Sequence, residues 1–101
     1  MMHIVYDEPR MELTIDGHAG YAPAGQDIVC AGVSALIMAM VDTFETDEIP
    51  YTMEHSNGYI HLRCLDFSME SGYLFHSVCI GLEHIASIYP DFIKIGGNNN
   101  G

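Results

Sequence analysis

Apolar and polar residues alternate near the start of the chain, as in strands that have one buried face. Residues 11–16 alternate strictly, and residues 3–6 form a shorter apolar run. The turn-forming segment 7–10 separates them, so we predict an antiparallel hairpin. Residues 17–25 follow with three glycines and Pro23, which is the composition of a loop, and we expect this loop to be mobile.

A long apolar segment from Asp27 to Phe44 has the periodicity of an α-helix, with Asp27 as its N-cap. The large apolar residues at helical spacing are Val29, Val33, Leu36, Ile37, Met40 and Phe44. A second stripe consists of the small residues Ala31, Ala35 and Ala39. Because the helix carries both stripes, we expect it to be buried on more than one side, against a sheet and a partner helix.

Residues 51–56 and 59–65 flank Asn57-Gly58, which is a strong signal for a two-residue β-hairpin turn. This turn sets the register and pairs Tyr51 with Cys64 and Met53 with Leu62. The core-facing residues of the second strand are then Ile60, Leu62 and Cys64. Cys64 is therefore interpreted as a small buried apolar residue.

A second helix is predicted to begin at Ser68 or Ser71 and to end before Pro90. Its apolar stripe is Leu74, Val78, Leu82, Ile85 and Tyr89. Residues 92–95 form a last strand. The order β-β-α-β-β-α-β indicates an α+β fold in which two helices pack on a mostly antiparallel sheet.

The length and composition indicate one domain. The chain has 101 residues, of which 49% are hydrophobic, enough for a core without disulfide or metal staples. We assign residues 1–96 to this domain and expect residues 97–101 to be a disordered tail. The three cysteines are widely separated, which argues against a disulfide framework, so we expect the protein to lie in the reducing cytoplasm. No segment is typical of a signal peptide or a membrane span.

The charge narrows the range of partners. The formal net charge is −11, and only Arg10, Arg63 and Lys94 are basic. Nucleic-acid binding depends largely on Lys and Arg contacts to phosphates, so direct binding to nucleic acid is not expected. A strongly negative surface favours encounter with basic partners, although it can also serve solubility alone.

The candidate chemistry lies in His18 and Cys30, twelve positions apart. Cys30 falls in the first turn of the predicted helix, where free amides and the helix dipole favour a thiolate by only roughly 0.3–1 kcal/mol. A protonated His18 beside the thiol would stabilise the thiolate further than the helix alone does. The two residues would then form a nucleophile and its general base. The amides at the start of the helix, together with those of the glycine-rich loop, are candidate oxyanion donors. Asp27 either caps the helix or orients His18, and Ser34 lies one turn beyond Cys30.

Non-catalytic interpretations of both residues stay open at this point. Cys30 can be a packing residue and His18 a solvated loop residue. His76, Cys79 and Glu83 share one helical face, but the chain has no pair of ligands at zinc-site spacing, so we expect no metal and no cofactor.

The chain carries Gly17-His18-Ala19 and Gly25, followed by Asp27-Ile28-Val29-Cys30-Ala31-Gly32-Val33-Ser34-Ala35. Both segments and the gap between them resemble the signature of the ribosomal-processing cysteine protease Prp family. The resemblance implies an endopeptidase that removes a short N-terminal extension from the large-subunit ribosomal protein L twenty-seven. It implies Cys30 as nucleophile, His18 as general base, Asp27 as the acidic residue before the helix and Ser34 as a supporting residue.

The resemblance also implies a homodimer and a loop, including Gly20, Tyr21 and Gly25, that moves to admit a peptide. A basic ribosomal protein precursor suits the negative charge. Two alternatives remain: a protease of a phage capsid or scaffold precursor, and a non-catalytic dimeric module that binds a ribosomal or assembly partner.

Overall fold

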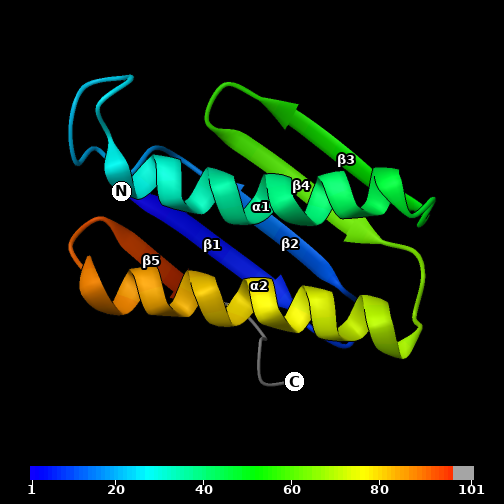
Figure 1. Cartoon of the computed structure of the whole chain (residues 1–101). Helices are drawn as coiled ribbons and strands as arrows, with labels where there is room; N and C mark the ends of the chain where they lie inside the picture. Colours follow the sequence, from blue (N-terminus) through cyan, green and yellow to red (C-terminus); the bar gives the residue numbers. More distant parts are fainter. Residues whose placement is uncertain (97–101) are drawn as a thin grey trace.

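The computed structural model describes residues 1–96 as a five-stranded sheet with two helices (Figure 1). The elements are β1 (Met2–Asp7), β2 (Glu12–Asp16), α1 (Ile28–Thr46), β3 (Tyr51–Ser56), β4 (Tyr59–Cys64), α2 (Met69–Ile88) and β5 (Ile93–Gly96). The predicted order and fold class are confirmed. The tail expected over residues 97–101 lies outside the described residues.

The strands are ordered β3-β4-β2-β1-β5 across the sheet. Only the β1–β5 pair is parallel, with Met2 opposite Ile93; the other three neighbouring pairs are antiparallel. The predicted register of the second hairpin is confirmed, because Tyr51 pairs with Cys64 and Met53 with Leu62. The Asn-Gly turn therefore determined which face of β4 is buried.

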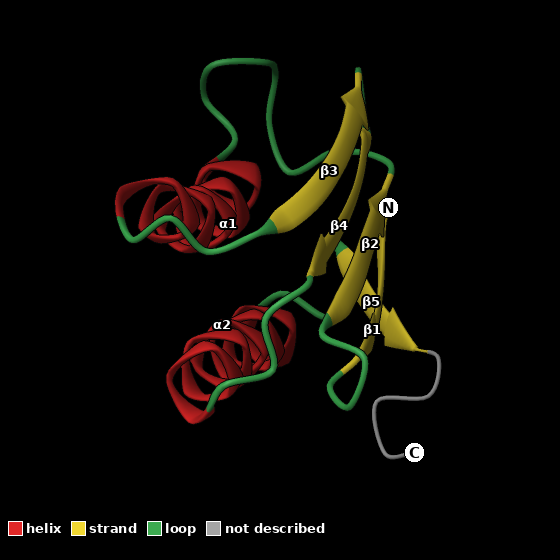
Figure 2. Cartoon of the chain, turned by 90° about the vertical axis from the view of Figure 1, so that its right-hand side faces the viewer, coloured by secondary structure: helices red, strands yellow, loops and turns green. Residues whose placement is uncertain are grey.

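Both helices cover the same face of the sheet (Figure 2). On that face Ile4, Leu13 and Leu62 are almost fully buried, which accounts for the alternation in the sequence. The opposite face carries polar side chains such as Glu12 and His61, whose Oε2 and Nε2 lie 2.7 Å apart. This hydrogen bond from His61 outweighs burial and lowers the pKa of Glu12.

The face of α1 that packs into the core is formed by Val29, Val33, Ile37, Met40, Val41 and Phe44. We predicted that a second stripe of α1 is also buried, and this prediction is wrong. Its residues are exposed in the part of the chain described: Ala31, Ala35 and Ala39. α2 packs instead beside Gly32 and Leu36. Among residues 1–96, α1 is the one helix whose length and hydropathy suit a membrane span, and core helices meet the same criteria.

The buried face of α2 is formed by Ser71, Phe75, Val78, Cys79 and Leu82. It is rotated relative to the predicted stripe, of which Leu74, Ile85 and Tyr89 are only half-buried. The helix contacts both the sheet and α1, so its apolar face is wider than one stripe.

Ser68 is the N-cap of α2, since its hydroxyl accepts from the Ser71 amide. The Asp66 Oδ2 accepts from the hydroxyls of Ser68 and Ser71, both at 2.6 Å, and these bonds lower the Asp66 pKa. One carboxylate therefore satisfies the buried Ser71 hydroxyl and fixes the connection from β4 to α2.

The contact between the helices gives a test of the packing. A Cβ at Gly81 would lie 2.9 Å from Leu36 Cδ1. We expect Gly81→Val to lower the free energy of unfolding by about 1–3 kcal/mol, because the added methyl groups overlap Leu36. Leu36→Ala should make room, so the double variant should lose less in urea unfolding than the two single changes together. Strict additivity would contradict this packing.

Candidate active site

A cleft with a volume of about 690 Å³ lies between the loop after β2, the first turns of α1 and the β3–β4 turn. Its loop residues are His18, Gly20, Ala22, Ala24, Gly25 and Gln26. The start of α1 contributes Asp27, Ile28, Cys30, Ala31 and Ser34, and the turn contributes Asn57. His18, Cys30 and Ser34 therefore line the same cleft.

A second, smaller pocket of about 160 Å³ shares His18, Cys30 and Ser34 with the cleft. Its apolar wall includes Met2, Ile15, Val33, Ile37 and Ile60. His18, Cys30 and Ser34 therefore lie between the open cleft and this apolar pocket.

Asp27 ties the start of α1 to the loop. Its Oδ1 accepts from the amides of Val29 at 3.0 Å and Cys30 at 2.9 Å, and its Oδ2 accepts from the Tyr21 amide at 3.0 Å. Burial opposes ionisation of this carboxyl, but the hydrogen bonds from Cys30 and Tyr21 outweigh it and hold the Asp27 pKa below its ordinary value. The geometry is that of an N-cap, and no hydrogen bond joins Asp27 to His18 in the part of the chain described.

The cap changes one expectation about the first turn of α1. The amides of Val29 and Cys30 are occupied by the Asp27 carboxylate, and that of Ala31 donates to the Asp27 carbonyl at 3.0 Å. The prediction that first-turn amides receive an oxyanion is therefore wrong for these three groups. The loop backbone is the other source of donors beside Cys30.

His18 is exposed and lies against the β3–β4 turn. The amide of Gly17 donates to the Gly58 carbonyl at 2.7 Å, which joins the start of the loop to this turn. A Cβ at Gly58 would lie 3.0 Å from His18 Nε2, and Gly58 has a φ of +75°. Gly58 therefore serves the turn and leaves room for the imidazole.

The sequence did not predict two features of the β3–β4 turn. We interpreted Asn57-Gly58 only as a turn, yet Asn57 lines the cleft and Gly58 borders His18. No local pattern reveals this, because the contact depends on β4 pairing with β2. Within residues 1–96, His18 and Cys30 line the same cavities without a hydrogen bond between them.

Cys30 differs from the other two cysteines in its surroundings. Cys30 is half-buried and faces both cavities, whereas Cys64 and Cys79 are buried. Burial, with the nearby charges of Glu8 and Glu83, raises the pKa of Cys79 to about 12. Of the three thiols, Cys30 is the one that a reagent in the cleft can reach.

Two of the residues considered above as metal ligands, His76 and Glu83 on α2, form hydrogen bonds with residues of the first hairpin. His76 Nδ1 lies 2.8 Å from Glu8 Oε1, and the Tyr6 hydroxyl donates to Glu83 Oε2 at 2.8 Å. Among residues 1–96, no three or more His, Cys, Asp or Glu side chains are grouped to hold a metal ion.

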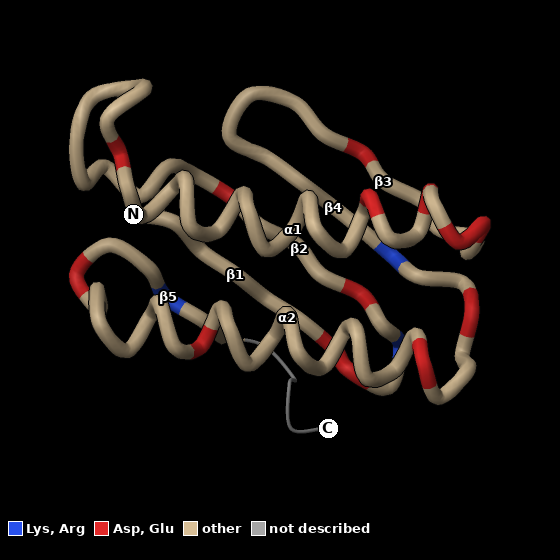
Figure 3. Tube along the Cα trace, in the orientation of Figure 1, with Lys and Arg blue, Asp and Glu red and all other residues tan. Residues whose placement is uncertain are grey.

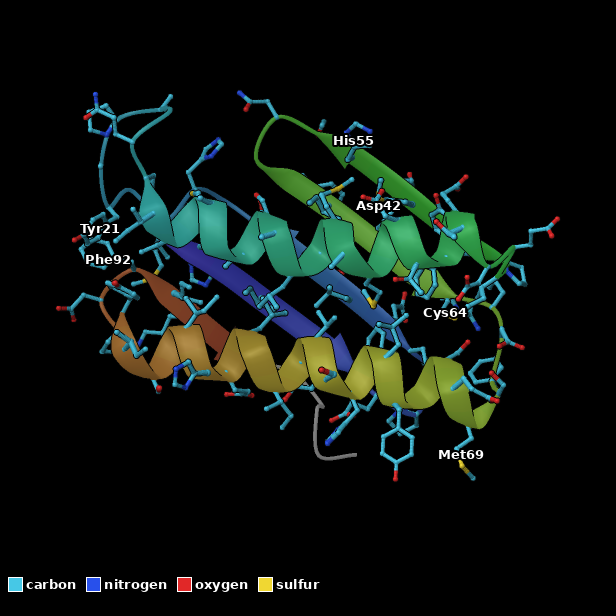
Figure 4. All side chains as sticks on the ribbon, in the orientation of Figure 1. Tyr21, Asp42, His55, Cys64, Met69 and Phe92 are labelled. Carbon is cyan, nitrogen blue, oxygen red and sulfur yellow. The ribbon has the colours of Figure 1, made fainter. Side chains whose placement is uncertain are left out.

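Tyr21 lies apart from the other predicted loop residues. Gly20 and Gly25 line the cleft, but the Tyr21 ring packs against Tyr89 and Phe92, beyond the C-terminal end of α2 (Figure 4). The sequence predicts that Tyr21 lies on the loop, but it does not predict which residues its ring contacts, because Tyr89 and Phe92 are far away in sequence.

The sequence matches a known protein family. The family model for the cysteine protease Prp matches residues 2–94. The chain is 36% identical over 83 residues to the ribosomal processing cysteine protease Prp of Mycoplasma genitalium, covering 82% of this chain and 84% of that protein. It is 31% identical over 98 residues to the protein of the same name from Staphylococcus aureus, covering 90% and 91%.

Solved structures share the fold. A structure of the Staphylococcus aureus ribosomal processing protease Prp with a covalently linked product peptide matches with a TM-score of 0.87 and 24% identity. It covers 97% of this chain and 100% of that one. A structure of the same protease with a substrate peptide matches with a TM-score of 0.77 and 22% identity, covering 96% and 97%.

The accessibility of the three thiols predicts selective alkylation. At neutral pH, iodoacetamide should modify Cys30 in the native protein and leave Cys64 and Cys79 unmodified, as read by mass spectrometry of peptides. His18→Ala should slow the reaction of Cys30 if the imidazole favours the thiolate. His55→Ala, which changes an exposed histidine outside both cavities, is the matched control. Equal reactivity of the three cysteines would rule out a distinct role for Cys30.

The Asp27 cap predicts a pH-dependent stability. Because the folded pKa is lowered, the carboxylate stabilises the fold above its ordinary pKa of 3.8, and this stabilisation is lost as the pH falls through the lowered value. Asp27→Asn can still cap α1 but turns an N–H donor toward the Tyr21 amide. We expect its thermal unfolding midpoint to lie below that of the wild type at pH 7 and to approach it under acid.

Asp27→Ala removes the cap as well and should cost a further ~0.5–2 kcal/mol of stability. A difference between the wild type and Asp27→Asn that is the same at pH 7 and pH 3 would contradict a role for the charge.

Proposed function

The chain belongs to the cysteine protease Prp family, and on that basis we propose that it is a cysteine endopeptidase that removes a short N-terminal extension from the precursor of ribosomal protein L twenty-seven. The observation that carries the proposal is the position of His18 and Cys30 on the shared wall of the cleft and the apolar pocket. The names of the Mycoplasma genitalium and Staphylococcus aureus relatives support ribosomal processing.

In the proposed reaction, Cys30 is the nucleophile and His18 is the general base. His18 takes the thiol proton as Cys30 Sγ bonds to the scissile carbonyl carbon, and it returns that proton to the leaving amine. The resulting thioester is hydrolysed by water, with His18 again accepting a proton. Because His18 is exposed and not hydrogen-bonded to Cys30 here, the imidazole must approach the thiol when the peptide binds.

Asp27 and Ser34 have supporting roles in this proposal. Asp27 holds the first turn of α1 and the loop together, so that Cys30 keeps its place in the cleft. Ser34 lines both cavities one helical turn beyond Cys30 and contacts the peptide there. Gly20 and Gly25 form part of the wall along which the peptide backbone lies.

Charge and shape favour a basic peptide with an apolar residue at the cleavage site. Neither helix nor the loop 17–27 contains Lys or Arg, and the three basic residues lie on β4, on β5 and in the β1–β2 turn (Figure 3). A basic precursor therefore meets no like charge at the cleft. The apolar pocket beside Cys30 accommodates one hydrophobic side chain next to the scissile bond.

The proposal includes a homodimer acting in the cytoplasm, where ribosomal precursors are assembled. In the described chain, Ala31, Ala35 and Ala39 are exposed along α1, and this smooth stripe is available to a second copy. Sedimentation of the purified protein measures this part of the proposal independently of cleavage.

The test is to incubate the protein with an N-terminally extended L twenty-seven precursor and to sequence the new N-terminus. Cys30→Ala should lower the rate at least about a thousandfold because the nucleophile is lost. His18→Ala should lower it by about a hundredfold or more because proton transfer is lost. Thermal unfolding of both variants should resemble that of the wild type, because Cys30 is only half-buried and His18 is exposed.

His55→Ala is the matched control and should cleave at the wild-type rate. Cleavage of a phage capsid or scaffold precursor in place of the ribosomal one would replace the substrate but keep the chemistry. Tight binding of a precursor with no cleavage by the wild type would favour the non-catalytic module. Cleavage that survives Cys30→Ala would overturn the mechanism.

A further inference from the structure

The loop that forms half of the cleft lining has few attachments of its own. Five of its residues between positions 20 and 26 line the cleft. Within residues 19–26, the Tyr21 amide donates to Asp27 Oδ2 at 3.0 Å, the backbone of Ala22 also contributes to lowering the Asp27 pKa, and the Gln26 amide donates to the Pro23 carbonyl at 2.9 Å. A glycine-rich segment of this kind is costly to order without side-chain anchors.

Tyr21 supplies such an anchor through its ring. The ring centroid lies 5.5 Å from that of Tyr89 with an interplanar angle of 82°, and 5.2 Å from that of Phe92 with an angle of 72°. Both are edge-to-face contacts, the favoured arrangement of aromatic pairs. Figure 4 shows Tyr21 and Phe92 next to each other, at the end of α2 nearest the loop.

The two partner rings are held by the fold and not by the loop. Tyr89 caps the C-terminus of α2, and its amide donates to the Ile85 carbonyl at 2.9 Å. Phe92 donates its amide to the Tyr89 carbonyl at 3.0 Å, and its carbonyl accepts from the Met2 amide at 2.9 Å. The turn between α2 and β5 is therefore a fixed platform for the Tyr21 ring.

We propose that Tyr89 and Phe92, which line neither cavity, are positioning residues for peptide binding: they hold Tyr21 and thereby the loop wall of the cleft. This inference rests on the proposed function. It adds to that function two residues that lie more than sixty positions after Tyr21 in the sequence. The loop forms the wall that a peptide lies along, whereas α1 carries Cys30. The platform therefore acts on binding more than on the chemical step.

The kinetic test uses Tyr89→Ala and Phe92→Ala with a precursor peptide. Each change should raise KM by about tenfold, the factor that corresponds to a lost aromatic pair, and should leave kcat within about twofold. Tyr89→Phe keeps the ring and should restore KM. Tyr73→Ala, which removes an exposed tyrosine from the outer face of α2, is the matched control and should leave both constants unchanged.

Tyr21→Ala separates anchoring from stability. Phe92 also packs against the core, whereas Tyr21 is 43% exposed, so the loop-side change should barely alter the thermal unfolding midpoint. It should raise KM at least as much as Phe92→Ala, because it removes both aromatic contacts, and adding Phe92→Ala to it should change KM little, because the contact between these two rings is already lost. Additive effects, or a loss confined to kcat, would overturn the proposal.

A second readout does not depend on catalysis. Hydrogen exchange of the Tyr21 amide should be faster in Phe92→Ala and in Tyr89→Ala than in the wild type, and unchanged in Tyr73→Ala. If the wild type cleaves no precursor but this exchange still rises, the proposed function fails and the anchor stands. If cleavage occurs but the exchange is unaffected, the anchor fails and the proposed function stands.

Discussion

A single carboxylate joins the two parts of the candidate active site. One oxygen of Asp27 accepts the first free amides of α1, and the other accepts the amide of Tyr21 from the loop. The helix start and the loop therefore cannot shift independently while this group is ionised. Cys30 depends on the first of these attachments for its orientation, and the cleft wall depends on the second. The negative charge of the Asp27 carboxylate beside Cys30 is the electrostatic cost of this arrangement.

The imidazole is placed by the sheet, from the opposite side of the cleft. β2 ends at Asp16, two residues before His18, and its pairing with β4 brings the Asn57-Gly58 turn against that residue. The two proposed reacting groups thus come from different parts of the fold: Cys30 lies on α1, and His18 lies in the loop after β2, against the β3–β4 turn. The aromatic platform beyond α2 adds a third attachment point for the segment between them.

Most of the fold was predictable because its signals are local. Alternation marked the strands, Asp27 marked the start of α1, and Asn57-Gly58 determined the hairpin register. The buried face of α2 and the exposure of Ala31 were not predictable, because they depend on how the helices meet. The same holds for the site: the positions of His18 and Cys30 followed from a short motif, whereas the neighbours of His18 and Tyr21 come from distant strands and turns.

The antiparallel pairing of β1 with β2, in which His3 lies opposite Asp16, brings the start of the chain beside the loop that carries His18. Met2 lines the apolar pocket, and a Cβ at Gly17 would lie 2.6 Å from the Met1 carbonyl oxygen. Any tag fused ahead of Met1 therefore begins one residue away from the pocket that Met2 and Cys30 both line, and it can block that pocket. Purification tags belong after β5, and residual tag residues at the front of the chain should be removed before enzymatic assays.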